Sequence, residues 1–402
     1  MGPGFRWLLG SSWVSNIGDG IALAAAPLLV AAQTRDPILV ALAALLQRLP
    51  WLLFGLWAGA LADRLDRRVV VMVADLFRAA VVGVLCLSIV TGHVSIVVVL
   101  GATLLYGVGE VFADTTTSTL LPMLVHRSDL GVGNARLQAG FLTMNQLAGP
   151  PIGAFLFAAG TVWPFLTQVL CVVLAVLLVA RIATPKGPVR NVSGTHLRQD
   201  IVDGLRWIQT HPPVRTLGMV ILAFNVTWGA AWSVLVLYSL DHLHMGAVGF
   251  GLLSTGVGVG GLLGTVGYGA LERRVPLATL MRACLLLEVL THLALALTTS
   301  AWLAVAIMVV FGAYAFVWGT LSQVVRQRAV PQEFQGRVAS VYLVALFLGL
   351  IVGQALGGPI AGRWGLTAPF WFAFAGAALT LAAVWRALTD IVDIGADAPA
   401  PD

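Results

Sequence analysis

Long apolar stretches dominate the chain, and twelve of them are long enough to cross a membrane, which takes about 20 apolar residues in a helix. They cover residues 8–32, 39–62, 69–90, 94–121, 137–160, 162–182, 214–240, 249–271, 277–297, 302–325, 338–362 and 367–388. These stretches are too long for the strands of an outer-membrane barrel and do not alternate as such strands do. Because backbone polar groups must be paired within hydrocarbon, the pattern predicts an all-α integral membrane protein with twelve transmembrane helices.

Composition supports lipid as the solvent of this chain. Of its 402 residues, 59% are hydrophobic and only 10% are charged, whereas a soluble domain has about 25% charged residues. The three cysteines, Cys86, Cys171 and Cys284, lie far apart in separate apolar stretches, so neither a disulfide framework nor a zinc site is expected. The only lysine, Lys186, is not part of a phosphate-binding loop. We therefore expect no cofactor, no metal and no enzymatic activity.

The basic residues predict the orientation of the helices. Placing both termini in the cytoplasm puts on the inner side Arg6, Arg64, Arg67, Arg68, Arg127, Arg136, Arg181, Lys186, Arg190, Arg198, Arg206, Arg215, Arg273, Arg274, Arg326, Arg328, Arg337 and Arg386. Only Arg35 and Arg363 then lie outside, and Arg78 and Arg282 lie inside helices near the inner side. This asymmetry follows the positive-inside rule. It predicts a multi-pass protein of the plasma (inner) membrane and accounts for the basic charge without a nucleic-acid partner.

The chain divides into two similar halves. The longest segment between apolar stretches predicts domains at 1–182 and 214–388, joined by a cytoplasmic linker over 183–213 and followed by a disordered tail over 389–402. In the linker, Leu197, Ile201, Leu205 and Ile208 recur at helical spacing, which predicts an amphipathic helix on the membrane surface. Two related six-helix halves are a known transporter plan.

The two halves share short motifs. Asp66-Arg67-Arg68 follows the second stretch, and Glu272-Arg273-Arg274 follows the eighth. Glycines also recur every four residues on the second, fifth, eighth and eleventh stretches. Such faces allow close helix packing, and they predict either a sliding interface between the halves or ordinary packing within them.

The segment from Gly59 to Arg68 resembles the signature loop of the major facilitator superfamily. Asp66 stands where that loop usually has glycine, and together with the paired arginines it is similar to the branch of siderophore exporters and macrolide-type drug efflux proteins. The resemblance implies a monomer with the major facilitator fold. It also implies that a group of residues holds a cytoplasmic gate, namely Gly59, Asp63, Arg64, Arg67 and Arg68.

The fifth stretch contains Gly149-Pro150-Pro151-Ile152-Gly153, which resembles the core of the antiporter signature of proton-coupled drug exporters. Ala154 replaces the last glycine of that signature. Proline removes a backbone donor and bends a helix, so the motif predicts a bend that occludes the cavity of an exporter. A passive kink is the alternative.

Four charges lie inside apolar stretches of the first half: Asp19, Arg48, Glu110 and Asp114. Such residues are costly in a bilayer and usually face an aqueous cavity. The resemblance implies that the first, fourth, seventh and tenth helices line that cavity. We therefore expect Asp19 or Glu110 to exchange protons while Arg48 pairs with one carboxylate. The helix-four arginine often linked to proton coupling is missing, and a static buried ion pair is the alternative.

Aromatic residues mark the corresponding helices of the second half. Trp228 and Trp232 are one turn apart, as are Tyr314 and Trp318, and such platforms suit amphipathic or cationic organic substrates. Helix packing or interface anchoring explains them equally well. Glu288 and His292 lie on a peripheral helix in the resembled fold, which favours a supporting role.

Together these features predict a secondary active transporter that exports small organic molecules, such as drugs, siderophores or secondary metabolites, by proton antiport and alternating access. Its partners would be the small-molecule substrate, protons and the lipid bilayer. Two alternatives within transport are a lysophospholipid or lipid-like flippase and a metabolite uptake transporter. An alternative of another class is a transport-inactive membrane sensor or assembly partner.

Overall fold

The computed structural model describes residues 1–183, 197–332 and 334–388, except the side chains of Leu56, Ala60, Asp63, Pro213 and residues 197–201. Within this part of the chain, nine helices are long and apolar enough to cross a membrane. They are α1 (Pro3–Gln33), α2 (Pro37–Arg64), α3 (Arg67–Val90), α4 (Ile96–Leu124), α9 (Pro212–Trp232), α11 (Ala247–Arg274), α12 (Leu277–Leu297), α13 (Ala301–Ala329) and α14 (Gln335–Trp364).

The other predicted spans are shorter or interrupted. The sixth and twelfth are the apolar helices α7 (Trp163–Val179) and α15 (Ala368–Val384). The fifth is a run of three elements: α5 (Leu130–Gly140), the π-helical segment η2 (Phe141–Ala148) and α6 (Gly149–Ala159). The seventh continues from α9 through α10 (Leu235–Leu237) and η3 (Tyr238–His242). Each of the twelve predicted stretches therefore coincides with helix, which confirms the all-α prediction.

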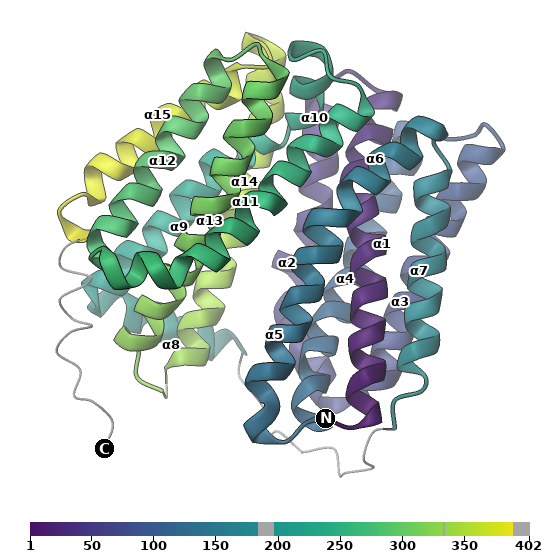
Figure 1. The fold of residues 1–402 in the computed structure, drawn as a ribbon, viewed down its shortest axis with the longest axis horizontal. Coiled ribbons are helices and arrows are strands. Elements are labelled where there is room, and N and C mark those ends of the chain that lie inside the picture. The colour runs from purple at the N-terminus through teal and green to yellow at the C-terminus, as the bar shows by residue number, and fades with distance from the viewer. Residues whose placement is uncertain (184–196, 333, 389–402) are drawn as a thin grey trace. The chain divides into compact units, whose positions relative to one another are not determined.

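The chain forms two compact units (Figure 1). The first comprises Met1–Gly194 and Ser239–Gly258, and the second comprises Thr195–Tyr238 and Val259–Asp402. The start of α11 thus groups with the first unit although it follows α9 in sequence. The domain boundaries expected from the sequence stay a prediction.

Polar residues between the apolar stretches begin several of the helices. Asp36 caps α2 by accepting a hydrogen bond from the backbone N–H of Ile38 at 2.9 Å. Asp66 caps α3 by the same kind of bond to the N–H of Arg68, also at 2.9 Å. The first N–H groups of a helix have no partner within the helix, so a carboxylate at this position stabilises the helix start.

Most of the glycine faces pack within their own unit. In the second unit, the backbone of α14 at Gly349, Gly353 and Gly357 lies so close to α9 that a Cβ at any of the three would collide with α9 backbone atoms. In the first unit, Gly149 and Gly153 of α6 meet α1 in the same way. These contacts correspond to ordinary close packing of helices, and the expected sliding interface is not needed to explain these glycines.

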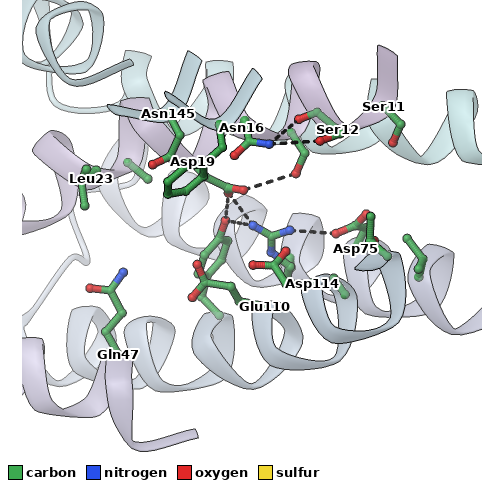
Figure 2. Close-up of a pocket in the computed structure, with 18 of the residues that line it drawn as sticks. Ser11, Ser12, Asn16, Asp19, Leu23, Gln47, Asp75, Glu110, Asp114 and Asn145 are labelled. Atoms are coloured by element: carbon green, nitrogen blue, oxygen red, sulfur yellow. Dashed lines mark hydrogen bonds and ion pairs between the residues drawn. The ribbon is translucent and has the colours of Figure 1, made fainter. Parts of the chain in front are cut away.

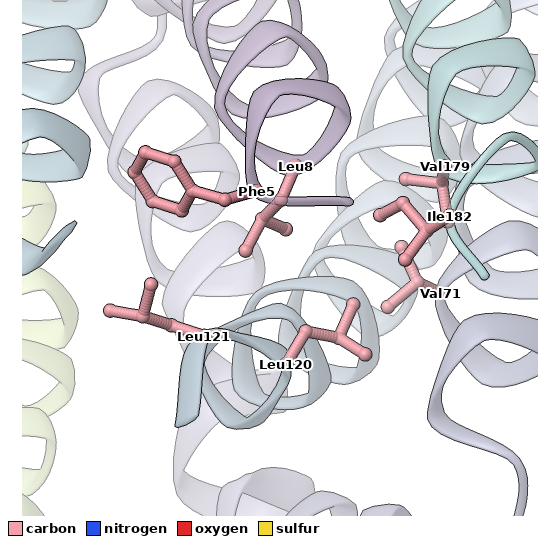
Figure 3. Packing of buried hydrophobic residues seen from close by; sticks show 7 residues of the cluster. All are labelled: Phe5, Leu8, Val71, Leu120, Leu121, Val179 and Ile182. Carbon is pink, nitrogen blue, oxygen red and sulfur yellow. The ribbon is translucent and has the colours of Figure 1, made fainter. Parts of the chain in front are cut away.

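An apolar cluster holds together the ends of four helices in the first unit (Figure 3). Its buried members are Phe5, Leu8, Val71, Leu120, Leu121, Val179 and Ile182. They come from the beginnings of α1 and α3, from the end of α4, and from the end of α7 together with the residues that follow α7. This end of the unit also carries the predicted gate motif.

The amphipathic segment of the linker forms the helix α8 (Leu197–Thr210). Its Ile208 is buried with Val214, Val330 and Val338, and the ring of Trp207 stacks on Phe334 at 5.7 Å. One face of α8 therefore packs against other parts of the second unit, and its placement on a membrane surface stays a prediction. Residues 184–196 of the predicted linker and the predicted tail 389–402 lie outside the described residues.

Candidate functional site

A cavity of about 300 Å³ lies within the first unit (Figure 2). Its wall comes from α1, α2, α3, α4 and η2, and much of it is polar. The four charges singled out in the first half all line this cavity: Asp19, Arg48, Glu110 and Asp114. The structure thus brings together residues that are up to 95 positions apart, counting from 19 to 114.

Arg78 of α3 is the centre of the charged network and has 0% of its surface exposed. Its Nη1 donates to Oδ1 of Asp75 at 2.8 Å, and its Nη2 donates to Oδ1 of Asp19 and to the hydroxyl of Tyr106. The Tyr106 hydroxyl in turn donates to the same oxygen of Asp19, and the guanidinium lies over the Tyr106 ring at 4.6 Å. Arg78 therefore joins α1, α3 and α4.

This network differs from the one expected from the sequence. Arg78, and not Arg48, is the arginine that pairs with Asp19. Arg48 is half-buried on the cavity wall, and within the described residues it forms no ion pair with a carboxylate. The sequence prediction assigned Arg78 to the inner face of the membrane because of its position along the helix. Its side chain instead points into the first unit, where it is fully buried.

Sequence reasoning also missed Asp75 and Tyr106. Asp75 and Arg78 are three positions apart in the apolar stretch 69–90, and residues at this spacing share one face of a helix. An acid and a base on one face of a membrane helix are a signal that could have identified the pair. Tyr106 has no such signal, because its role depends on which face of α4 meets α1.

Glu110 and Asp114 lie one turn apart on α4 and differ from Asp19 in having no cationic partner. Oε2 of Glu110 is buried without a hydrogen-bond partner among the described residues. Asp114 lines the same cavity, its side chain is exposed there, and no Arg, Lys or His of the described residues lies within 4.0 Å of it. The cavity thus holds an ion-pair network, in which Arg78 pairs with two carboxylates, beside two carboxyl groups that have no ion-pair partner among the described residues.

The antiporter-like motif positions the part of α1 that carries Asp19. A Cβ on Gly149 would collide with Gly20, and a Cβ on Gly153 would collide with the backbone of Ile21. Gly20 in turn faces the backbone of Asn145 in η2, where its own Cβ would lie 2.8 Å from the Asn145 Cα. π-helical segments are frequent at functional sites, and this one contacts the helix that carries Asp19. Pro150 is buried in the first turn of α6.

The arginines of the gate motif bind carbonyl groups within the first unit. Arg67 donates to the backbone oxygens of Ala62 at 3.1 Å and Thr119 at 3.2 Å, and Arg68 donates to that of Ala180. Cations near helix C-termini are favourable because the last carbonyls have no partner within the helix. These bonds fasten the ends of α2, α4 and α7.

Of the other members of the gate motif, the structure describes the side chain of Arg64 and the surroundings of Gly59. Arg64 is exposed, and the nearest atom to a Cβ on Gly59 would be in Thr115 at 4.0 Å. The side chain of Asp63 lies outside the part of the chain that the structure describes. A gating role of the motif stays a prediction.

Three of the four predicted aromatic residues of the second unit, Trp228, Trp232 and Tyr314, form one cluster around Phe311. Trp228 and Trp232 stack at 4.7 Å, and Phe311 lies 5.2 Å from Trp232 and 5.6 Å from Tyr314. Tyr314 is buried, and its hydroxyl bonds to Glu288 of α12. Trp318 lies one turn further along α13 and is half-buried.

Comparisons with known proteins agree with this architecture. The profile of the transmembrane secretion effector family matches residues 2–400. The multidrug efflux pump Tap of Mycolicibacterium fortuitum is 31% identical over 379 residues, which are 90% of this chain and 90% of Tap. The enterobactin exporter EntS of Shigella boydii serotype 4 is 24% identical over 88% of this chain and 84% of EntS.

Among solved structures, a bacterial homologue of the iron transporter ferroportin in its inward-facing state has a TM-score of 0.77. Its sequence is 17% identical to this chain, and the structural match covers 98% of the homologue and 96% of this chain. At this identity the likeness concerns the fold. The family match and the relatives confirm the resemblance identified from the signature loop: the chain belongs to the transmembrane secretion effector family of the major facilitator superfamily and is a multi-pass membrane efflux transporter.

Proposed function

We propose that this protein exports small organic molecules in exchange for protons, and that the carboxyl groups of the cavity in the first unit take up and release those protons. Glu110 and Asp114 are the proposed proton carriers. The network of Asp19, Arg78 and Tyr106 is proposed to respond to their charge.

The observation that carries the proposal is the buried Oε2 of Glu110, which has no ion-pair partner among the described residues, beside an arginine that already has two carboxylates. A buried polar atom without a partner is costly, and an isolated buried carboxylate is more costly still. Glu110 is therefore stabilised by a proton when water is excluded and releases it when the cavity is wet. Acidic residues inside membrane helices are common members of proton pathways.

Coupling follows from competition for Arg78. The charge of Glu110 acts on Arg78 and on Asp19 through the low-dielectric interior. When Glu110 or Asp114 loses its proton, the new negative charge attracts the guanidinium away from Asp19. Because Arg78 joins α1, α3 and α4, a change in its partners would alter the packing of α1. We propose that alternating access of the cavity to the two sides of the membrane depends on this change.

The proposed substrates are drugs, siderophores or secondary metabolites, since the relatives are named as a multidrug pump and an enterobactin exporter. The stacked Trp228 and Trp232 would contact apolar or aromatic parts of such molecules. We propose a monomer in the plasma (inner) membrane with both termini in the cytoplasm, in line with the distribution of arginines.

Everted membrane vesicles that carry the protein provide the test. An imposed pH gradient should drive uptake of a fluorescent organic cation such as ethidium, and Glu110→Gln and Asp19→Asn should each reduce the rate by about 10-fold or more, the scale of a lost proton-transfer group. Asp129→Asn is the matched control, because Asp129 lies in the short helix η1 (Arg127–Asp129) outside the cavity.

Equal, gradient-driven rates in all three variants, at matched protein levels, would exclude this mechanism. Movement of a fluorescent lysophospholipid without any gradient would favour the flippase. Absence of flux for a broad panel of compounds would favour the transport-inactive sensor.

A further inference from the structure

The second unit contains a buried acid–base cluster that the proposed mechanism does not use. Glu288 and His292 lie one turn apart on α12, with 8% and 1% of their surfaces exposed. Nε2 of His292 is 3.0 Å from Oε1 of Glu288. The Tyr314 hydroxyl of α13 donates to Oε2 of Glu288 at 2.8 Å and lies 3.1 Å from Oγ1 of Thr291.

The charged and titratable groups around this cluster are few. α12 packs against α13, which contributes Tyr314, and against α15, which has no ionisable side chain, and Tyr238 of η3 donates to the α12 carbonyl of Leu295. On α12 itself, Cys284 lies one turn before Glu288, and Arg282 donates to the carbonyl of Trp385. Within the described residues His292 is the only ion-pair partner of Glu288.

The charge of the pair therefore depends on protons. An ionised Glu288 beside a neutral His292 carries a charge of −1 in a site with no arginine or lysine to balance it. One added proton makes the pair neutral overall, whether it resides on the imidazole or on the carboxyl group. Nδ1 of His292 is buried without a partner among the described residues. Since an uncompensated buried charge is costly, the neutral pair with one added proton is the form that suits this buried site.

The Tyr314 hydroxyl can report this protonation. It can donate to Oε2 of Glu288 when the carboxyl group is ionised. When Oε2 carries a proton, the hydroxyl can accept that hydrogen bond and donate its own hydrogen to Thr291, since a hydroxyl is both donor and acceptor. The Tyr314 ring meets Phe311 edge-on, and Phe311 meets Trp228 and Trp232.

We propose that Glu288 and His292 form a second proton-binding site of this transporter, and that Tyr314 transmits its protonation state to the aromatic cluster of Phe311, Trp228 and Trp232. This site lies outside the cavity of the first unit, so it goes beyond the proposed function. It gives the second unit its own response to pH at the residues proposed to contact substrate.

Infrared difference spectroscopy of the purified protein between acidic and alkaline pH tests the site without any transport. The wild-type protein should show a carboxylic-acid carbonyl band that is absent in Glu288→Gln and whose midpoint moves by about one pH unit, a tenfold change in proton affinity, in His292→Gln. Tyr238→Phe is the matched control. Tyr238 is also a buried tyrosine of the second unit, and its hydroxyl donates to a backbone carbonyl, that of Leu295, at 2.6 Å.

Tryptophan emission tests the transmission step. The wild-type protein should show a pH-dependent change of emission at the midpoint of the carbonyl band. Tyr314→Phe should remove this change while the band persists, and Tyr238→Phe should keep both. A carbonyl difference spectrum that is the same in Glu288→Gln, His292→Gln and wild type would overturn the proton site. An unchanged emission response in Tyr314→Phe would overturn the transmission. Neither result depends on whether protons drive export.

Discussion

Replacing Arg78 with methionine should strongly destabilise the first unit. The side chain of Arg78 is 1% exposed, and those of its partners Asp75 and Asp19 are 6% and 15% exposed. Methionine has similar length without the charge, so both carboxylates would lose their cationic partner inside the protein. Removing one member of a buried ion pair costs about 3–5 kcal/mol, because the other charge stays buried and uncompensated.

The expected loss can be measured by thermal unfolding in detergent. About 1 kcal/mol shifts the melting temperature by about 2–4 °C in a domain of 150–250 residues, so a cost of about 3 kcal/mol corresponds to about 6–12 °C. A thiol-reactive dye suits this protein because Cys86 of α3 and Cys284 of α12 are buried in the folded state. Heating rates must be identical, since unfolding of such proteins is often irreversible.

Two further variants make this experiment decisive. Arg64→Met removes an exposed arginine and should change the melting temperature little. Adding Asp75→Asn to Arg78→Met removes one of the uncompensated carboxylates and should restore about 0.5–3 kcal/mol, the usual coupling between contacting residues. A loss in Arg78→Met no greater than that in Arg64→Met, or no recovery in the double variant, would refute the buried network as described.

Two other predictions concern packing and helix ends. Gly153→Ala should lower the stability of the first unit by about 1–3 kcal/mol, measured by thermal unfolding, because its Cβ would collide with the backbone of Ile21. Gly55→Ala, with open space around its Cβ, should be neutral or stabilising. Equal shifts of the melting temperature in the two variants would contradict the role of the α1–α6 contact. Arg68→Gln should lose about 1 kcal/mol because its charged bond to the Ala180 carbonyl at the end of α7 is removed, and a melting temperature equal to wild type would contradict that role.

Several features of the site could be predicted from the sequence because they are local. The cost of a charge in hydrocarbon makes Asp19, Glu110 and Asp114 conspicuous in apolar stretches, and the structure places all three in one cavity. The spacing of Glu110 and Asp114 by four residues already puts them on one face of a helix. The antiporter-like motif could also be identified from the sequence, but its packing against α1 could not.

The partners of these residues could not be predicted in the same way. Arg48 and Arg78 are both arginines within apolar stretches, and nothing in their spacing to Asp19 distinguishes them. Which one pairs with Asp19 depends on how α1, α2 and α3 are rotated about their axes. Likewise Glu288 was assigned to a peripheral helix, although its contact with Tyr314 links it to the aromatic cluster.

The sequence by itself determined that this chain is a bundle of twelve membrane helices, because the length of an apolar stretch and the pairing of its backbone groups are properties of each segment alone. Its signature loop also identified the family. Only the tertiary structure decided that Arg78 pairs with Asp19, that Tyr106 joins this pair, and that Glu288 meets Tyr314. Such pairings join residues from different helices, and they depend on side-chain direction and helix rotation, which hydropathy along the chain does not encode.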